Sequence, residues 1–184
     1  MASSTAPTSS RLSPRPLDEL VRSARAGESA GIGELYDRYA GSLFRTAYRL
    51  TGSAADAEDV VHDVFVGLPE ALRRYEERGS FAGWLTRVTV RTTLMRARSG
   101  RRRREAPLDD ALTAASPARA DAGAEYEDLH RAVLALPDGL REVFVLKQVE
   151  GYSHDEIAAL LDITAGASRV RLTRALEALR GALR

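Results

Sequence analysis

Apolar residues recur every three or four positions over most of the chain, which predicts helices rather than strands. A first short helix covers positions 17–24 and is ended by Gly27. A second runs from about 31 to 50, where Thr51 and Gly52 end it. No segment alternates between apolar and polar residues in the two-residue period of a strand. The fold class predicted from this pattern is therefore all-α.

Two more helices follow in the first half of the chain. Ser53, with Asp56 three residues later, begins a third helix with apolar positions between 60 and 68. Pro69 should kink or break this helix, because proline lacks an amide hydrogen and clashes with the preceding turn. Ser80 caps a fourth helix, which runs out in the basic segment 96–104.

The chain divides after residue 104. Positions 105–124 are rich in alanine, aspartate, proline and serine without sustained periodicity, which indicates a flexible linker. Helices resume at about residue 125 and continue to the end. We therefore predict two small helical domains, at 17–104 and 125–184, and a disordered tail at 1–16.

The last segment, 151–184, has the layout of a helix-turn-helix. Ser153 and Glu156 form a capping box ahead of an apolar run, Asp162 and Ile163 end that helix, and Thr164 caps the next. Five arginines follow Ile163 against a single acid. A short helix, a tight turn and a basic second helix favour binding in the DNA major groove. The alternative is a helical hairpin that packs onto its own domain.

Composition excludes several classes of function. The chain has 184 residues and no cysteine, so disulfides, thiolate metal sites and cysteine nucleophiles are ruled out. No apolar run approaches the roughly 18 residues of a membrane span. The sequence offers no nucleophile–base pair, metal-ligand spacing or glycine-rich phosphate loop. We expect a cytoplasmic chain that is not an enzyme, binds no cofactor or metal, and has no membrane partner.

Charge is segregated along the first half of the chain. Positions 53–70 carry five acids and no lysine or arginine, whereas positions 86–104 carry eight arginines and no acid. A basic helix suits a phosphate backbone. An acidic helix beside it would repel DNA and is expected to face a basic protein partner. This interpretation requires the two charged surfaces to stay apart; the alternative is that both are merely solvated faces.

Aromatic residues flank a polar turn immediately before the basic helix. Tyr75, Phe81 and Trp84 stand close to arginines, an arrangement that can hold unstacked bases because any base stacks on a ring. Helical spacing also predicts Phe81 and Trp84 as core residues, and for Trp84 the core placement is favoured. Tyr75 is expected to be exposed.

Five motifs occur in a fixed order along the chain: DAEDVVHDVF, RGSFAGWL, LPDGLREVFVL, GYSHDEIA and GASRVRL. Together they resemble bacterial sigma factors of the extracytoplasmic-function group, in the minimal form that has only the second and fourth conserved regions. The resemblance implies a subunit that binds core RNA polymerase and directs promoter-specific initiation. The alternative is a stand-alone dimeric helix-turn-helix regulator.

The resemblance also implies roles for individual residues. The helix of DAEDVVHDVF would dock on the clamp helices of the polymerase largest subunit through Asp59, His62 and Asp63. The next surface would melt and read the minus-ten promoter element through Tyr75, Ser80, Trp84, Arg87, Arg91 and Thr92. The helix-turn-helix would read the minus-thirty-five element. The residues involved would be Ser153, which caps its first helix, and Arg169, Val170, Arg171, Thr173 and Arg174 of its last helix. The C-terminal domain would also contact the polymerase flap, and an anti-sigma factor is a further partner that the resemblance suggests.

Four positions depart from the pattern of the family. Many members have glycine at Asp162 and Thr-Val at Ala167 and Ser168, and Pro69 is unusual in its helix. Asp162 is expected to place an acid near the DNA side of the turn. Ala167 lacks a hydroxyl that could bind phosphate.

Overall fold

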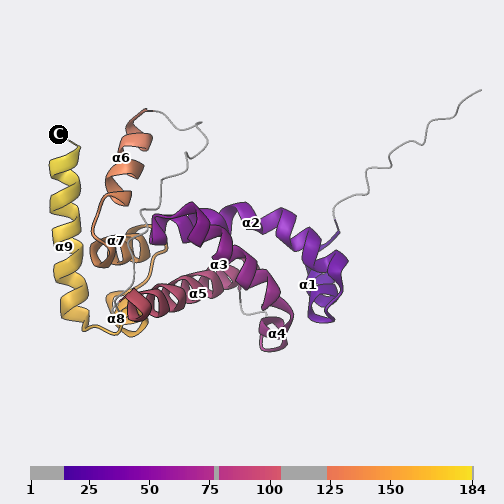
Figure 1. Ribbon diagram of the computed structural model, residues 1–184. Coiled ribbons are helices and arrows are strands. Elements are labelled where there is room, and N and C mark those ends of the chain that lie inside the picture. Colours follow the sequence, from indigo (N-terminus) through magenta and orange to yellow (C-terminus); the bar gives the residue numbers. More distant parts are fainter. Residues whose placement is uncertain (1–14, 77–78, 105–123, 184) are drawn as a thin grey trace, which may run out of the picture.

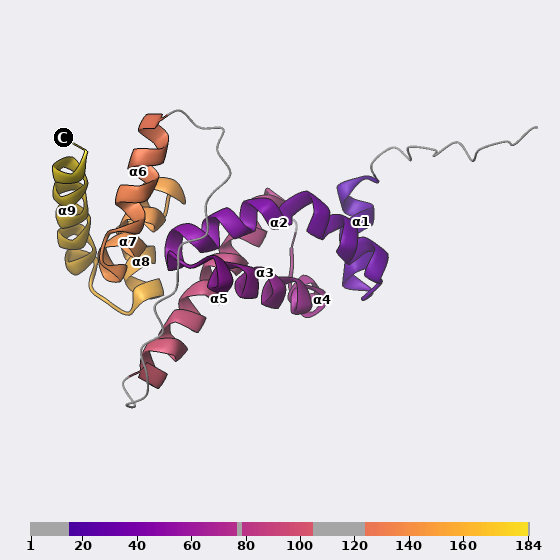
Figure 2. The same ribbon diagram turned by 45° about the horizontal axis from the view of Figure 1, so that its top comes forward.

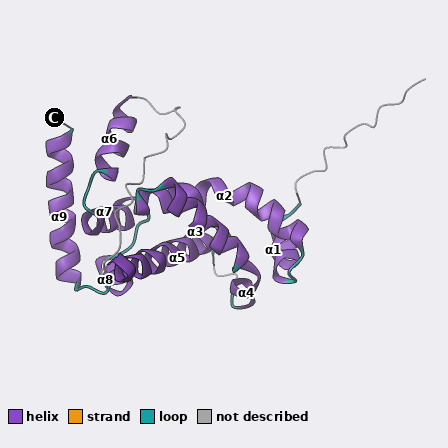
Figure 3. Cartoon of the chain, viewed as in Figure 1, coloured by secondary structure: helices purple, strands orange, loops and turns teal. Residues whose placement is uncertain are grey.

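The computed structural model describes residues 15–76, 79–104 and 124–183, and all of its regular structure is helical (Figure 1, Figure 3). Within these ranges there are nine α-helices, one π-helical turn and no strand. The all-α prediction is confirmed. The predicted tail at 1–16 and linker at 105–124 fall almost entirely outside the described residues, as does the middle of the turn at 75–80.

The first half of the chain forms five helices: α1 (Leu17–Arg25), α2 (Ser29–Thr51), α3 (Ala54–Val66), α4 (Leu68–Arg73) and α5 (Phe81–Arg104). The second half forms four helices and the π-helical turn: α6 (Ala124–Leu134), α7 (Asp138–Phe144), the π turn Val145–Val149, α8 (His154–Leu161) and α9 (Ala165–Ala182).

Short-range chemistry sets the boundaries of the first helices. Gly52 ends α2 in the left-handed conformation, with φ of 72°. Ser53 begins α3, because its hydroxyl accepts a hydrogen bond from the Asp56 amide at 3.2 Å. Pro69 lies in the first turn of α4, and α3 ends before it at Val66, so the predicted break is confirmed.

One hydrophobic core joins helices α1 to α5. The long α2 lies against α1, α3 and α5, and its inward residues meet those of its neighbours. The fully buried leucines and valines of this core are Leu20, Leu35, Leu43, Val60, Leu68, Leu72 and Leu85.

A second core crosses from the first half of the chain to the second. Leu50 of α2 and Val90 and Leu94 of α5 are buried with residues of α6 to α9. Both ribbon views place α7 and α8 beside the ends of α2 and α5 (Figure 1, Figure 2). The buried members from the second half are Val133, Leu136, Val143, Val145, Leu146, Ile157, Ala175 and Leu179.

Arg141 of α7 is buried where the two halves meet. Its guanidinium donates to the carbonyls of Leu50 at 3.3 Å and Thr51 at 3.0 Å, at the end of α2. It also donates to the carbonyls of Leu134 and Leu136, at 3.1 and 3.0 Å. An ion pair with Asp138 at 2.6 Å completes the set. The side chain thus donates to carbonyls at the ends of α2 and α6, where the last helical carbonyls lack partners within the helix, and to the carbonyl of Leu136 in the turn before α7.

We expect Arg141→Met to lower the free energy of unfolding by about 3–5 kcal/mol, because it leaves buried carbonyls without donors. Arg131→Met is the matched control, since Arg131 is exposed and pairs only with Asp128. Its expected cost is under about 1 kcal/mol. Urea unfolding followed by circular dichroism measures both. Equal midpoints for the two variants would contradict this role for Arg141.

Candidate nucleic-acid interface

The helix-turn-helix begins with the predicted capping box. The hydroxyl of Ser153 accepts from the Glu156 amide at 3.2 Å, and the Glu156 carboxylate accepts from the Ser153 amide at 2.8 Å. These bonds favour the charged carboxylate and lower the pKa of Glu156. The start of α8 is therefore fixed by two reciprocal bonds, as the sequence predicted.

The turn between α8 and α9 contains a backbone conformation that favours glycine. Asp162 has φ of 55° and ψ of 51°, and among the non-glycine residues described it alone has positive φ. Glycine adopts this conformation more readily than aspartate, because it has no Cβ. After it, the Thr164 hydroxyl accepts from the Ala167 amide at 3.0 Å and caps α9 as predicted.

We expect Asp162→Gly to stabilise the protein by about 0.5–1 kcal/mol, because glycine adopts the left-handed conformation without steric cost. The same change removes a negative charge from the turn, so the weak, non-specific affinity of the chain for duplex DNA should rise. Thermal unfolding and fluorescence anisotropy measure the two effects. Asp162→Ala is the control for charge, since it removes the carboxylate but keeps the strain. A loss of stability in Asp162→Gly would refute the explanation.

One face of α9 is open to solvent. Arg169, Val170, Thr173 and Arg174 are exposed together at spacings of one and four residues, and half of the Val170 surface is accessible. The structure thus brings four of the predicted minus-thirty-five residues onto one face. Arg171 points elsewhere: a Cβ on Gly139 of α7 would lie 3.4 Å from its Nη1 atom.

Sequence reasoning missed one contact that fixes the two helices of the motif. Ser168 of α9 is completely buried, and its hydroxyl lies 2.9 Å from His154 Nδ1 at the start of α8. A signal was available, because Ser168 precedes the buried Ala175 by seven residues and so falls on the inward face of α9. The imidazole of His154 thus gives the buried hydroxyl of Ser168 a hydrogen-bond partner, which buried polar groups require.

The aromatic residues form a compact cluster before and within α5. The ring centroids of Tyr75 and Trp84 are 4.7 Å apart, and Phe81 lies 5.5 Å from each. Phe81 is buried and Trp84 half-buried, as core placement predicted. The expectation of an exposed Tyr75 is wrong, because its ring packs against the hydrophobic core and Arg25 holds its carbonyl at 3.2 Å.

A cavity of about 250 Å³ opens beside this cluster. Tyr75, Ser80, Trp84 and Arg87 line it, so four of the six predicted minus-ten residues meet at one place. Its remaining lining residues are Arg74, Glu76 and Gly79.

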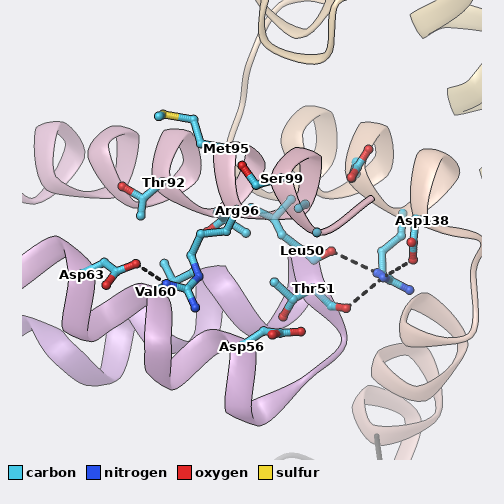
Figure 4. Close-up of a pocket in the computed structure, with 15 residues that line it drawn as sticks. Leu50, Thr51, Asp56, Val60, Asp63, Thr92, Met95, Arg96, Ser99 and Asp138 are labelled. Carbon is cyan, nitrogen blue, oxygen red and sulfur yellow. Dashed lines mark hydrogen bonds and ion pairs between the residues drawn. The ribbon is translucent and has the colours of Figure 1, made fainter. Parts of the chain in front are cut away.

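The other two predicted minus-ten residues lie elsewhere on α5. Arg91 is exposed one turn beyond Arg87. Thr92 lines a separate groove of about 660 Å³ between α3, α5 and α7, together with Asp63 and Arg96 (Figure 4).

The predicted acidic surface of α3 is exposed, but an arginine side chain of α5 pairs with two of its carboxylates. Asp59, His62 and Asp63 are all accessible. Arg96 of α5 pairs with Asp63 (Figure 4). It also pairs with Asp59, at 2.6 Å.

The expectation that the two charged surfaces stay wholly apart is therefore wrong at Arg96. The physical reason is that α3 and α5 pack side by side, so a long side chain on one helix reaches the carboxylates of the other. These groups are 39–63% exposed, and such pairs each contribute less than about 1 kcal/mol. Arg87 and Arg91 make no ion pair within the described part of the chain.

Among the described helices, none has the length and apolar character needed to cross a membrane.

Comparisons with known proteins match both halves of the chain. Residues 35–103 match the model of Sigma-70 region 2, and residues 126–179 match that of Sigma-70, region 4. The chain is 37% identical over 153 residues to ECF RNA polymerase sigma factor SigE of Mycolicibacterium smegmatis, covering 80% of this chain and 59% of that protein. It therefore spans less than two thirds of that relative's length.

Other relatives are matched along nearly their whole length. The chain is 28% identical over 180 residues to ECF RNA polymerase sigma factor SigW of Bacillus subtilis, and the match covers 89% of this chain and 95% of SigW. A solved structure, the sigma factor RpoE of Bartonella quintana in complex with the anti-sigma factor NepR, has the same fold. It superposes with a TM-score of 0.59 at 21% identity, covering 82% of this chain and 95% of RpoE.

Proposed function

The chain belongs to the extracytoplasmic-function group of sigma-70 factors, and we propose from this that it binds core RNA polymerase and directs transcription initiation at specific promoters. The observation that supports the proposal is that one chain has two surfaces suited to nucleic acid: an aromatic and basic cavity before α5 and an exposed basic face on α9. The chain would act in the cytoplasm, and its contribution is binding, while the polymerase performs the chemistry.

The cavity beside Trp84 suits a base of the minus-ten element. Its volume, about 250 Å³, is sufficient for one flipped base, and two of its walls are aromatic rings on which a base can stack. Arg74 and Arg87 stand at the same cavity and would hold the adjoining phosphates. Because this arrangement favours a single strand over a duplex, it would trap melted promoter DNA. Arg91 would extend the phosphate track along α5.

The exposed face of α9 suits the major groove of the minus-thirty-five element. Arg169 and Arg174 can donate in pairs to guanine edges, while Val170 offers an apolar surface to a thymine methyl group. Thr173 lies between them on the same face and is available for either base or phosphate. Ser153 and Arg171 would contact the flanking phosphates.

The acidic face of α3 suits a basic surface on the polymerase clamp. Asp59, His62 and Asp63 are exposed in a row, and the weak ion pairs with Arg96 can be exchanged for intermolecular ones. The second helical unit would contact the polymerase flap. An anti-sigma factor is a further proposed partner, as the solved relative is described in complex with one.

Transcription with purified components tests this proposal. The chain is mixed with core polymerase and a template carrying the DNA upstream of its own gene, and run-off transcripts are counted. We expect a discrete start that core alone does not give. No transcript above core alone, on any promoter from the same genome, would refute the proposal.

The alternative, a stand-alone dimeric regulator, makes a different prediction. Such readers bind paired half-sites as dimers. We expect instead a monomer by light scattering and no footprint on duplex DNA without polymerase. The aromatic cavity has no role in the alternative.

A further inference from the structure

We propose that His154 is a positioning residue for promoter reading, and that it acts through the buried hydroxyl of Ser168 to set how α9 presents its basic face to the minus-thirty-five element. The imidazole need not touch a base for this role. The inference rests on the proposed function, because it takes the exposed face of α9 as the surface that reads DNA.

The two side chains join the beginnings of both helices of the motif. His154 is the first residue of α8, and Ser168 is the fourth residue of α9. The Nδ1 atom of His154 lies 2.9 Å from the hydroxyl oxygen of Ser168, which is completely buried. The intervening chain contains the rest of α8 and the whole turn, so this hydrogen bond is a tertiary contact between the two helices.

Ser168 is the polar exception on the inward face of α9. The other buried residues of this helix, Ala175 and Leu179, are apolar. Apolar packing is non-directional, whereas a hydrogen bond weakens steeply when its angle becomes poor. A buried hydroxyl also requires a partner. The bond to His154 therefore restricts the orientation of α9 against α8 more tightly than an apolar side chain at position 168 would.

Without His154, the hydroxyl of Ser168 has an alternative acceptor on its own helix. A serine inside a helix can donate to the carbonyl four residues before it, and such bonds often bend the helix. Here that carbonyl belongs to Thr164, and it already accepts from the Ser168 amide at 3.0 Å. His154 gives the hydroxyl a partner outside the helix, which favours a regular first turn of α9.

The first turn of α9 leads directly into the proposed reading face. Arg169 and Val170 follow Ser168 in the chain, and both are exposed. Paired donation from an arginine to a guanine edge requires both donors in place, so a bend before Arg169 weakens it. Attraction to phosphates depends on charge and tolerates the same bend. Loss of the bond should therefore lower discrimination between promoters more than it lowers affinity for DNA as a whole.

Two substitutions of His154 separate the two nitrogen atoms of its ring. Asparagine can place an amide near the position of Nδ1 and keep the bond to Ser168, whereas the longer glutamine places its amide near that of Nε2. Each full-length variant is combined with core polymerase. Run-off transcripts are counted on a promoter that the unaltered chain uses and on the same promoter with one altered base pair in the minus-thirty-five element.

The ratio of transcripts from these two templates is the readout. We expect His154→Gln to lower the ratio by at least about fivefold and His154→Asn to keep it within about twofold of that of the unaltered chain. Affinity for core polymerase, measured by fluorescence anisotropy, should be the same for all three chains. A glutamine variant that discriminates like the unaltered chain, or an asparagine variant as defective as the glutamine variant, would overturn the proposal.

Ser168→Ala tests the pair from its other side. This change removes the hydroxyl, so it should lower the ratio about as much as His154→Gln does. The double variant should be no worse than either single variant, because both changes remove the same contact. Losses that multiply in the double variant would show that the two residues act separately, and would overturn the proposal. Failure of the proposed function is distinct, since the unaltered chain would then give no discrete start on any promoter.

Discussion

Arg174→Glu is expected to abolish initiation that depends on the minus-thirty-five element while leaving affinity for core polymerase unchanged. Arg174 lies on the exposed face of α9 with Arg169, Val170 and Thr173. Charge reversal removes a donor to base or phosphate and adds a charge that DNA repels. The lost contact alone accounts for about 1–3 kcal/mol, and with the added repulsion we expect at least about a 100-fold loss of run-off transcripts.

The control for this variant is on the same helix. Arg180→Glu makes the same change at an exposed residue six positions further on, which a helix turns to a different face. Arg180→Glu should reduce initiation only slightly, because a charge outside the DNA-facing surface acts on DNA only through long-range electrostatics, which salt screens. If Arg180→Glu is as defective as Arg174→Glu, the effect is one of net charge, and the assignment of a reading face to α9 is wrong.

Asp63→Arg is expected to weaken binding to core polymerase by at least about tenfold while leaving the DNA surface of α9 intact. Asp63 is exposed at the centre of the acidic face of α3, between Asp59 and the end of the helix. An arginine there places a cation against a basic partner, and like charges across an interface are costly. Fluorescence anisotropy of labelled chain against core polymerase gives the affinity.

Arg96→Ala separates two explanations of that loss. Asp63→Arg destroys the ion pair between α3 and α5 as well as the acidic face, whereas Arg96→Ala destroys the ion pair alone. Arg96→Ala also frees two carboxylates, so core affinity should be unchanged or stronger. An equal loss in both variants would mean that the pair serves to hold α3 against α5, and the acidic face would lose its proposed role.

Local features of the structure were predictable because they depend on a few consecutive residues. The capping box at Ser153, the left-handed end of α2 at Gly52 and the break at Pro69 each follow from backbone chemistry within one helical turn. Helical periodicity likewise placed Phe81 in the core and Arg174 on an open face. The family resemblance supplied roles that periodicity cannot supply.

Features that depend on how helices meet were not predictable from the sequence. Tyr75 was expected to be exposed, but its ring packs against Phe81 and Trp84 at the start of α5. Arg96 reaches Asp59 only because α3 and α5 are adjacent. Arg141 is part of one of the five motifs, yet a charged residue is rarely buried. Its carbonyl partner Leu50 lies 91 residues away in the sequence, so the sequence does not indicate that the two meet.

The π-helical turn Val145–Val149 was also not anticipated. Its defining bond joins the Glu150 amide to the Val145 carbonyl at 3.0 Å, five residues apart. The apolar pattern of this segment fits an α-helix equally well, so periodicity cannot distinguish the two.

We propose that one negatively charged surface of the chain, on α3, binds the polymerase, and that separate positive surfaces, on α5 and α9, bind DNA. The most direct test is a side-by-side titration of core polymerase with Asp63→Arg and Arg174→Glu. The account predicts that Asp63→Arg binds at least about tenfold more weakly and that Arg174→Glu binds like the unaltered chain. Equal weakening of both variants would contradict it.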